Sequence, residues 1–277
     1  MNRLIGVIPN LFTLGNAICG FSAIVIAAKL DLSNGDSAGQ ALLLKWSAGM
    51  IFLAMVFDVL DGYVARLIKV TSDFGGQLDS LCDAISFGAA PAFLILNFGR
   101  DWEHPLVRNA FACVAAFYMA CAIVRLAKYN LDIAIPEPGV FKKFKGLPSP
   151  GAGGCIASLA LVRSLGATEV PGMEMLTARN FVSFWGLGGS FLVALLMVSP
   201  FPYGHLTKHI LRKKIIVGWA IALPLVAPVL FYYPELIFFT LFWIYALNAP
   251  VRQVTYMVFR RRFAEAQPPQ LDDFSHR

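Results

Sequence analysis

Four aspartates at regular spacing are the residues of this sequence best suited to chemistry. They lie in the stretch DVLDGYVARLIKVTSDFGGQLDSLCD, as Asp58, Asp61, Asp79 and Asp83. On a helix, residues three or four positions apart project from one face, so Asp58 pairs with Asp61 and Asp79 pairs with Asp83. Carboxylate oxygens are the ligands preferred by Mg²⁺, Mn²⁺ and Ca²⁺. The spacing therefore predicts a divalent-metal site built from two helices.

Small residues and one arginine accompany the aspartates. Gly62 and Ala65 share the helical face of the first pair, and Gly75 precedes the second pair by about one turn. Small side chains let a bulky ligand approach the helix backbone closely. The planar guanidinium of Arg66 suits a phosphate, which it can bind through two parallel hydrogen bonds. Together these features indicate a phosphate ester or diphosphate substrate.

The composition is that of a membrane protein. Of 277 residues, 57% are hydrophobic and 14% are charged, whereas soluble domains are about 45–50% apolar and about a quarter charged. Apolar blocks of about 20 residues, long enough to cross a bilayer, recur along the chain. We expect an all-α, polytopic membrane helix bundle with about eight transmembrane helices, at residues 11–28, 41–64, 79–98, 108–127, 147–163, 181–199, 213–233 and 235–257.

The distribution of basic residues predicts the orientation. Placing the N-terminus inside puts 17 of the 23 Lys and Arg residues on the cytoplasmic side, as the positive-inside rule requires. Both termini and the aspartate stretch are then cytoplasmic, at the cell (inner) membrane. The net charge of +6 is explained by cytoplasmic loops and anionic headgroups, without a nucleic-acid partner. We expect one transmembrane domain at 1–262 and a polar, disordered tail at 263–277.

The aspartate stretch resembles a known signature. Its pattern D-x2-D-G-x2-A-R-x8-G-x3-D-x3-D matches the CDP-alcohol phosphatidyltransferase family at all eight fixed positions. The resemblance implies an integral membrane enzyme, usually a homodimer. Such an enzyme moves the phosphatidyl group of a CDP-linked lipid to an alcohol and releases CMP.

The resemblance also assigns roles to the residues of the signature. It implies two divalent ions, with Asp58, Asp61 and Asp79 as ligands and Asp83 completing the second site. Asp83 is also the implied general base. The nucleotide would be lined by Gly62, Ala65 and Gly75, and a phosphate would be held by Arg66.

Further stretches are similar to the membrane-spanning phosphatidylserine synthases within this family. They are IPNLFTLGNAICG, AISFGAAPA, RLAKYNL and FKGLPSPGAGG, and the similarity covers roughly residues 1–160. It implies CDP-diacylglycerol as donor, L-serine as acceptor and membrane lipids as surroundings. Lys128 departs from the pattern, which has an arginine there, and so lacks the bidentate fork.

Several polar residues outside the signature have two interpretations each. Asn10, Thr13 and Asn16 either cap and cross-link helices or contact the CDP headgroup. A second set is explained by membrane anchoring and turn chemistry, or else it binds the serine carboxylate or the lipid phosphate: Arg125, Lys128, Asn130 and Ser149.

Two alternatives to a serine-specific transferase remain open. The first is the same family with another acceptor alcohol, such as glycerol 3-phosphate or inositol, or with an ether-lipid donor. The stretch AISFGAAPA after Asp83 speaks against those acceptors. The second is a non-enzymatic transporter or ion-binding membrane protein. The complete signature opposes it, and the sequence shows no matching helix interruptions in two halves, as transporters often do.

Overall fold

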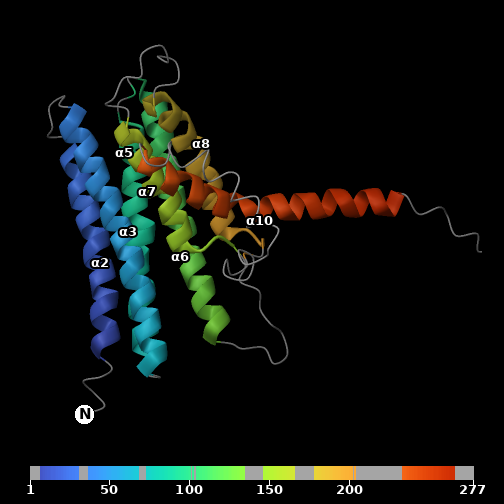
Figure 1. Cartoon of the computed structure of the whole chain (residues 1–277), viewed down its shortest axis with the longest axis horizontal. Coiled ribbons are helices and arrows are strands. Elements are labelled where there is room, and N and C mark those ends of the chain that lie inside the picture. Colours follow the sequence, from blue (N-terminus) through green and yellow to red (C-terminus); the bar gives the residue numbers. More distant parts are fainter. Residues whose placement is uncertain are drawn as a thin grey trace, which may run out of the picture.

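The computed structural model describes residues 7–30, 37–68, 73–100, 102, 104–134, 146–165, 178–201, 203 and 233–265. Within these residues every regular element is a helix, which confirms the all-α prediction (Figure 1). The elements are α2 (Val7–Ala28), α3 (Ser37–Ile68), α4 (Asp73–Asp83), the π-helical turn η2 (Ala84–Ala89), α5 (Ala90–Phe98), α6 (Pro105–Ala134), α7 (Ser149–Ser164), α8 (Ala178–Val198) and α10 (Pro234–Glu265).

Five segments of the described chain are long and apolar enough to cross a membrane. They are Pro9–Ala28, Ala38–Ile68, Phe74–Phe98, Pro105–Leu131 and Pro234–Gln253. The prediction of a polytopic helix bundle is therefore confirmed, but the count of eight is not. The predicted spans 147–163 and 181–199 correspond to the shorter helices α7 and α8, and 213–233 lies outside the described residues except for Tyr233. The predicted tail also lies outside them from residue 266 onward, since α10 continues to Glu265.

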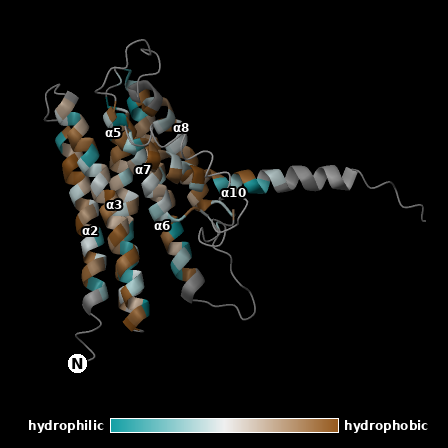
Figure 2. Ribbon diagram, in the orientation of Figure 1, coloured by the Kyte–Doolittle hydropathy of each residue, from teal (hydrophilic) through white to brown (hydrophobic). Residues whose placement is uncertain are grey.

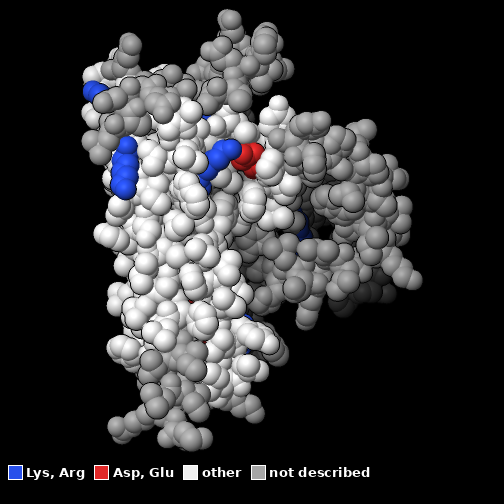
Figure 3. Space-filling model, turned by 60° about the vertical axis from the view of Figure 1, so that its left-hand side comes forward, with Lys and Arg blue, Asp and Glu red and all other residues white. Residues whose placement is uncertain are grey.

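Polarity is arranged as in a protein surrounded by lipid. Asn16, Ser47 and Ser86 are completely buried, whereas Leu106 is 71% exposed and Phe184 is 83% exposed. Hydrophobic residues recur along the length of the helices (Figure 2), and they include both buried and exposed side chains. The face shown in Figure 3 has few charged side chains among its described residues. A soluble monomer rarely exposes so much apolar surface, so these faces are suited to acyl chains.

The core of the bundle is α7, which contacts α3, α5, α8 and α10. All residues from Gly151 to Ala160 are buried, because α7 carries small residues on several sides and its neighbours approach closely. A Cβ at Gly153 would lie 3.2 Å from the ring of Phe87, and a Cβ at Gly154 would collide with the ring of Phe242 on α10. The glycines and small residues of the predicted span 147–163 are therefore what allows this packing.

The segment α4–η2–α5 is one continuous helix that widens in the middle. Pro91 has no backbone N–H and so cannot donate to the carbonyl of Phe87, four residues earlier. The hydroxyl of Tyr118 on α6 donates to that carbonyl at 3.1 Å. The wider turn Ala84–Ala89 follows Asp83 directly, and π turns of this kind are frequent at functional sites.

The last described helix, α10, leaves the bundle. It runs across the other helices and extends beyond them at its C-terminal end (Figure 1). Its first half is attached to the bundle by an ion pair of 2.8 Å between Lys45 and Glu235. The hydroxyl of Tyr203 also donates to the carbonyl of Ala246 at 2.8 Å.

Candidate active site

The aspartates lie where α3 ends and α4 begins. The two helices are connected by residues 69–72 alone. Asp58 and Asp61 lie within the last three turns of α3, and Asp79 and Asp83 lie a similar distance after the start of α4, so the turn brings both pairs to one level. At 1.5 Å per residue α3 is about 48 Å long, more than the roughly 30 Å hydrocarbon core. The aspartates, about 10–15 Å from its end, therefore lie near one membrane surface.

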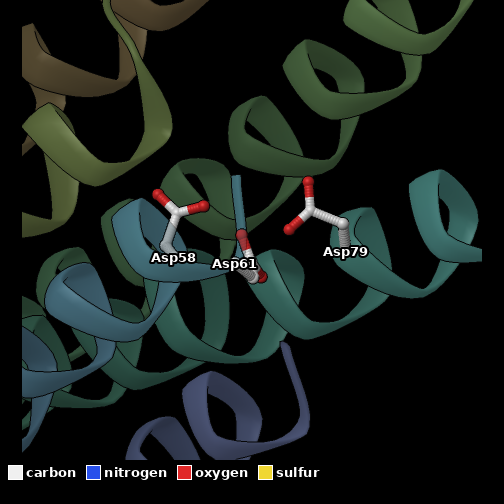
Figure 4. A group of neighbouring side chains, drawn as sticks. All are labelled: Asp58, Asp61 and Asp79. Atoms are coloured by element: carbon white, nitrogen blue, oxygen red, sulfur yellow. The ribbon is translucent and has the colours of Figure 1, made fainter. Parts of the chain in front are cut away.

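Three of the four carboxylates converge. One oxygen from each of Asp58, Asp61 and Asp79 lies within 4.8 Å of the other two, and the side chains face a common space (Figure 4). Asp61 is 6% exposed, and the other two are half-buried. In the described part of the chain, Asp61 Oδ2 and Asp79 Oδ1 are buried without a hydrogen-bond donor.

This group of carboxylates fits a divalent cation. Like charges held so close repel each other unless a cation is shared between them. No salt bridge joins Asp58, Asp61 or Asp79 to a lysine or arginine among the described residues. Oxygen-only ligands with free lone pairs suit a hard ion such as Mg²⁺ or Mn²⁺.

Asp83 lies next to this group and is held differently. It is 7% exposed, and its Oδ1 accepts a hydrogen bond of 2.9 Å from Nδ2 of Asn16 on α2. The structure thus gathers three of the four predicted carboxylates in one cluster, and bonds the fourth to a helix that carries none of them.

The glycine side of the site is open. A Cβ added at Gly62 would meet no described atom within 4 Å. Arg66 is exposed, and its Nε donates to the Gly62 carbonyl at 2.8 Å, which lays the side chain along α3. Ala65 and Gly75 are half-buried. Of the predicted nucleotide-lining residues, Gly62 therefore borders open space among the described residues.

The two predicted residues on α2 differ in exposure. Asn10 is half-buried, whereas Thr13 is 4% exposed. The Thr13 hydroxyl donates to the carbonyl of Pro9 at 3.1 Å, a bond within the helix that is common for threonine. Asn16 makes an interhelical hydrogen bond, one of the two interpretations open for it from the sequence.

A half-buried arginine borders the site from α6. Nη1 of Arg125 donates to the hydroxyl of Ser149 at 2.8 Å, and its Nε is buried with no acceptor in the described residues. Its positive charge interacts with the carboxylates of Asp83 and Asp58. A guanidinium with unused donors, near acids but not ion-paired to them, can accept an anionic group.

The turn before α7 fixes the partner of this arginine. Gly146 has a φ of +88°, and a Cβ there would collide with the carbonyl oxygen of Met197, so glycine is required. Its N–H donates to the Phe201 carbonyl at 2.9 Å. Ser149 follows as the first residue of α7 and is 1% exposed. The GLPSP motif thereby places the hydroxyl against Arg125.

The other two predicted substrate residues behave differently from each other. Asn130 Oδ1 accepts a hydrogen bond of 3.0 Å from the Ser80 hydroxyl, which ties the end of α6 to α4 beside Asp79. Lys128 is exposed.

The sequence analysis did not identify Ser86 and Tyr118, which hold the segment after Asp83. Pro91 is a usable signal for Tyr118, because a proline inside a helix leaves a carbonyl that needs another donor.

Comparison with known proteins agrees with this geometry. Residues 6–200 match the model of the CDP-alcohol phosphatidyltransferase family. A CDP-diacylglycerol–serine O-phosphatidyltransferase of Helicobacter pylori is 30% identical over 223 residues, which cover 79% of this chain and 80% of the relative. The enzyme of that name from Bacillus subtilis is 31% identical over 73% of this chain and 92% of its own length. One from Methanocaldococcus jannaschii is 40% identical over 46% of this chain and 56% of its own.

The match includes the aspartate cluster, the glycine face of α3, the π turn and α7, and covers well over half of the sequence. On this basis, the chain belongs to the CDP-alcohol phosphatidyltransferase family.

Proposed function

We propose that the chain transfers the phosphatidyl group of CDP-diacylglycerol to the hydroxyl of L-serine, giving phosphatidylserine and CMP. The convergence of the signature carboxylates Asp58, Asp61 and Asp79 supports a transferase of this family. The shared name of the Helicobacter and Bacillus relatives supports serine as the acceptor.

Divalent metal is part of this proposal. Asp58, Asp61 and Asp79 would hold the first ion, and Asp83 would complete a second site, with Mg²⁺ or Mn²⁺ favoured over Ca²⁺. Bound there, two ions would neutralise the diphosphate oxygens and stabilise charge that develops at phosphorus. Gly62, with open space beside it, would let the nucleotide lie against α3.

The side chains around the cluster have separate tasks in the transfer. The serine oxygen forms a bond to the phosphorus of the phosphatidyl group, and the bond from that phosphorus to the CMP oxygen breaks. The electron pair leaves on CMP, and the hydroxyl proton passes to Asp83, a buried carboxylate outside the cluster. Arg125, oriented by Ser149, would bind the serine carboxylate and so place the hydroxyl for attack.

The orientation and assembly are proposed on the same basis. The excess of basic residues at one set of loops supports a cytoplasmic active site and cytoplasmic termini. A homodimer is the expected assembly for the family.

The test is acceptor selectivity of the purified protein in detergent. CMP release and the lipid product, identified by mass spectrometry, would be followed with serine, glycerol 3-phosphate or inositol. We expect product with serine alone. Product with another alcohol would retain the family and reject serine, and absence of CMP release with every alcohol, from folded protein, would reject the transferase proposal.

A further inference from the structure

We propose that Asn16 is a positioning residue for Asp83, whose carboxylate it holds in one orientation through a hydrogen bond to Oδ1. This inference rests on the proposed function, because it concerns the carboxylate assigned there as the base. Asn16 lies on α2, which carries none of the four aspartates.

Asn16 is joined to the segment around Asp83 by two hydrogen bonds. Its side-chain Nδ2 donates to Asp83 Oδ1 at 2.9 Å. Its main-chain carbonyl accepts a hydrogen bond of 2.8 Å from the hydroxyl of Ser86, three residues further along. One bond fixes the carboxylate and the other fixes the π turn that follows it, so rotation of the Asp83 side chain is opposed at both ends.

The close approach of α2 makes this arrangement possible. Gly20 lies one turn after Asn16, and a Cβ there would be only 2.5 Å from the Cα of Ser86. Real Cβ atoms do not approach a backbone this closely, so the helices meet at a distance that glycine alone permits. Without this contact Asn16 could not reach Asp83 with its side chain and Ser86 with its main-chain carbonyl.

The opposite side of the segment is also held. The Tyr118 hydroxyl donates to the carbonyl of Phe87, and Tyr118 is completely buried. The turn after Asp83 is therefore fixed between α2 and α6. A carboxylate with a defined direction needs such fixation of the backbone that follows it.

The bonding pattern of the amide is the most specific observation. Asn16 is completely buried, and its Oδ1 has no hydrogen-bond donor among the described residues. Its orientation is thus set by Asp83 through Nδ2. The bond uses one lone pair of Asp83 Oδ1 and so fixes the direction in which the carboxylate presents its remaining lone pairs.

The experiment combines thermal unfolding with kinetics. Asn16→Ala, Asp83→Ala and the double variant would be unfolded in detergent with chelator, so that neither metal nor turnover contributes. If the residues are bonded, the loss of Tm in the double variant is smaller than the sum of the single losses. The matched control is Ser47→Ala, which removes another buried hydrogen bond to α2, from Ser47 Oγ to the Ala23 carbonyl at 2.9 Å.

The kinetic arm separates positioning from general packing. We expect Asn16→Ala to lower kcat by about 10- to 100-fold, as for residues that orient a working side chain, with the KM values for serine and CDP-diacylglycerol unchanged. Asn16→Asp, which keeps the volume but replaces the donor by a carboxylate, should lower kcat further. Ser47→Ala should lose stability but keep its kcat.

Three outcomes would overturn the proposal. They are additive Tm losses in the cycle, a kcat for Asn16→Ala equal to that of Ser47→Ala, or a raised KM for CDP-diacylglycerol with normal kcat, which would make Asn16 a nucleotide contact. The unfolding cycle does not depend on turnover, so it reads the Asn16–Asp83 bond even if serine proves not to be the acceptor.

Discussion

Replacing Gly62 by alanine tests whether the open face of α3 receives the nucleotide. The only described glycine with positive φ is Gly146, so alanine fits the backbone at Gly62. A Cβ there would meet nothing within 4 Å among the described residues. Gly→Ala at such a position stabilises the fold by about 0.4–1 kcal/mol. The unliganded variant should therefore unfold at the same temperature as the wild type or slightly above it.

The effect on substrate should be the opposite. A methyl group placed between α3 and a nucleotide in van der Waals contact costs about 1–3 kcal/mol, as overpacking does. We expect the KM for CDP-diacylglycerol to rise between about 5-fold and about 150-fold, since about 1.4 kcal/mol corresponds to a factor of ten. The KM for serine should not change.

Gly49→Ala is the matched control. Gly49 lies on the same helix, and a Cβ there also meets nothing within 4 Å in the described structure, but it is about 20 Å along α3 from Gly62. CMP release from CDP-diacylglycerol in mixed micelles at saturating serine would be measured for both variants. An unchanged KM of Gly62→Ala for CDP-diacylglycerol would refute the proposal that the nucleotide lies against Gly62. Equal effects of Gly62→Ala and Gly49→Ala would show that the effect is not specific to the part of α3 around Gly62.

Three further substitutions test separate parts of the account. Asp61→Asn should lower CMP release at least about 100-fold without lowering Tm, since it relieves like-charge repulsion in the cluster; near-normal turnover would exclude Asp61 from the site. Arg125→Lys keeps the charge but loses the bidentate guanidinium. The KM for serine, measured at saturating CDP-diacylglycerol, should therefore rise about tenfold with kcat little changed. A change in kcat alone would contradict binding of the serine carboxylate by Arg125. Tyr118→Phe leaves the Phe87 carbonyl without its donor, and thermal unfolding should show a loss of about 1–3 kcal/mol; an unchanged Tm would mean that the π turn is held by other contacts.

The sequence contains enough to predict the membrane bundle and the carboxylate pairs, for identifiable reasons. Apolar blocks of membrane-spanning length and offsets of three and four residues depend on local geometry alone. The short link between α3 and α4 brings Asp58, Asp61 and Asp79 together without any need for long-range information. The signature then indicates the chemistry.

What the sequence could not show depends on contacts between distant segments. The bond from Asn16 to Asp83 spans 67 residues and the one from Tyr118 to Phe87 spans 31, and neither follows from a helical period. The span at 147–163 is a short, fully surrounded helix because Gly153 and Gly154 admit aromatic rings from other helices. A hydropathy pattern does not distinguish such a helix from one that faces lipid.

The most direct test of the account is metal dependence of the serine reaction in the purified protein. CMP release from CDP-diacylglycerol with serine would be measured after chelation and again after Mg²⁺ or Mn²⁺ is returned. The account predicts that chelation abolishes release, that either ion restores it in the wild type, and that neither restores it in Asp61→Asn. Undiminished, serine-dependent CMP release in the presence of chelator would contradict the central claim that the aspartate cluster acts through a bound divalent ion.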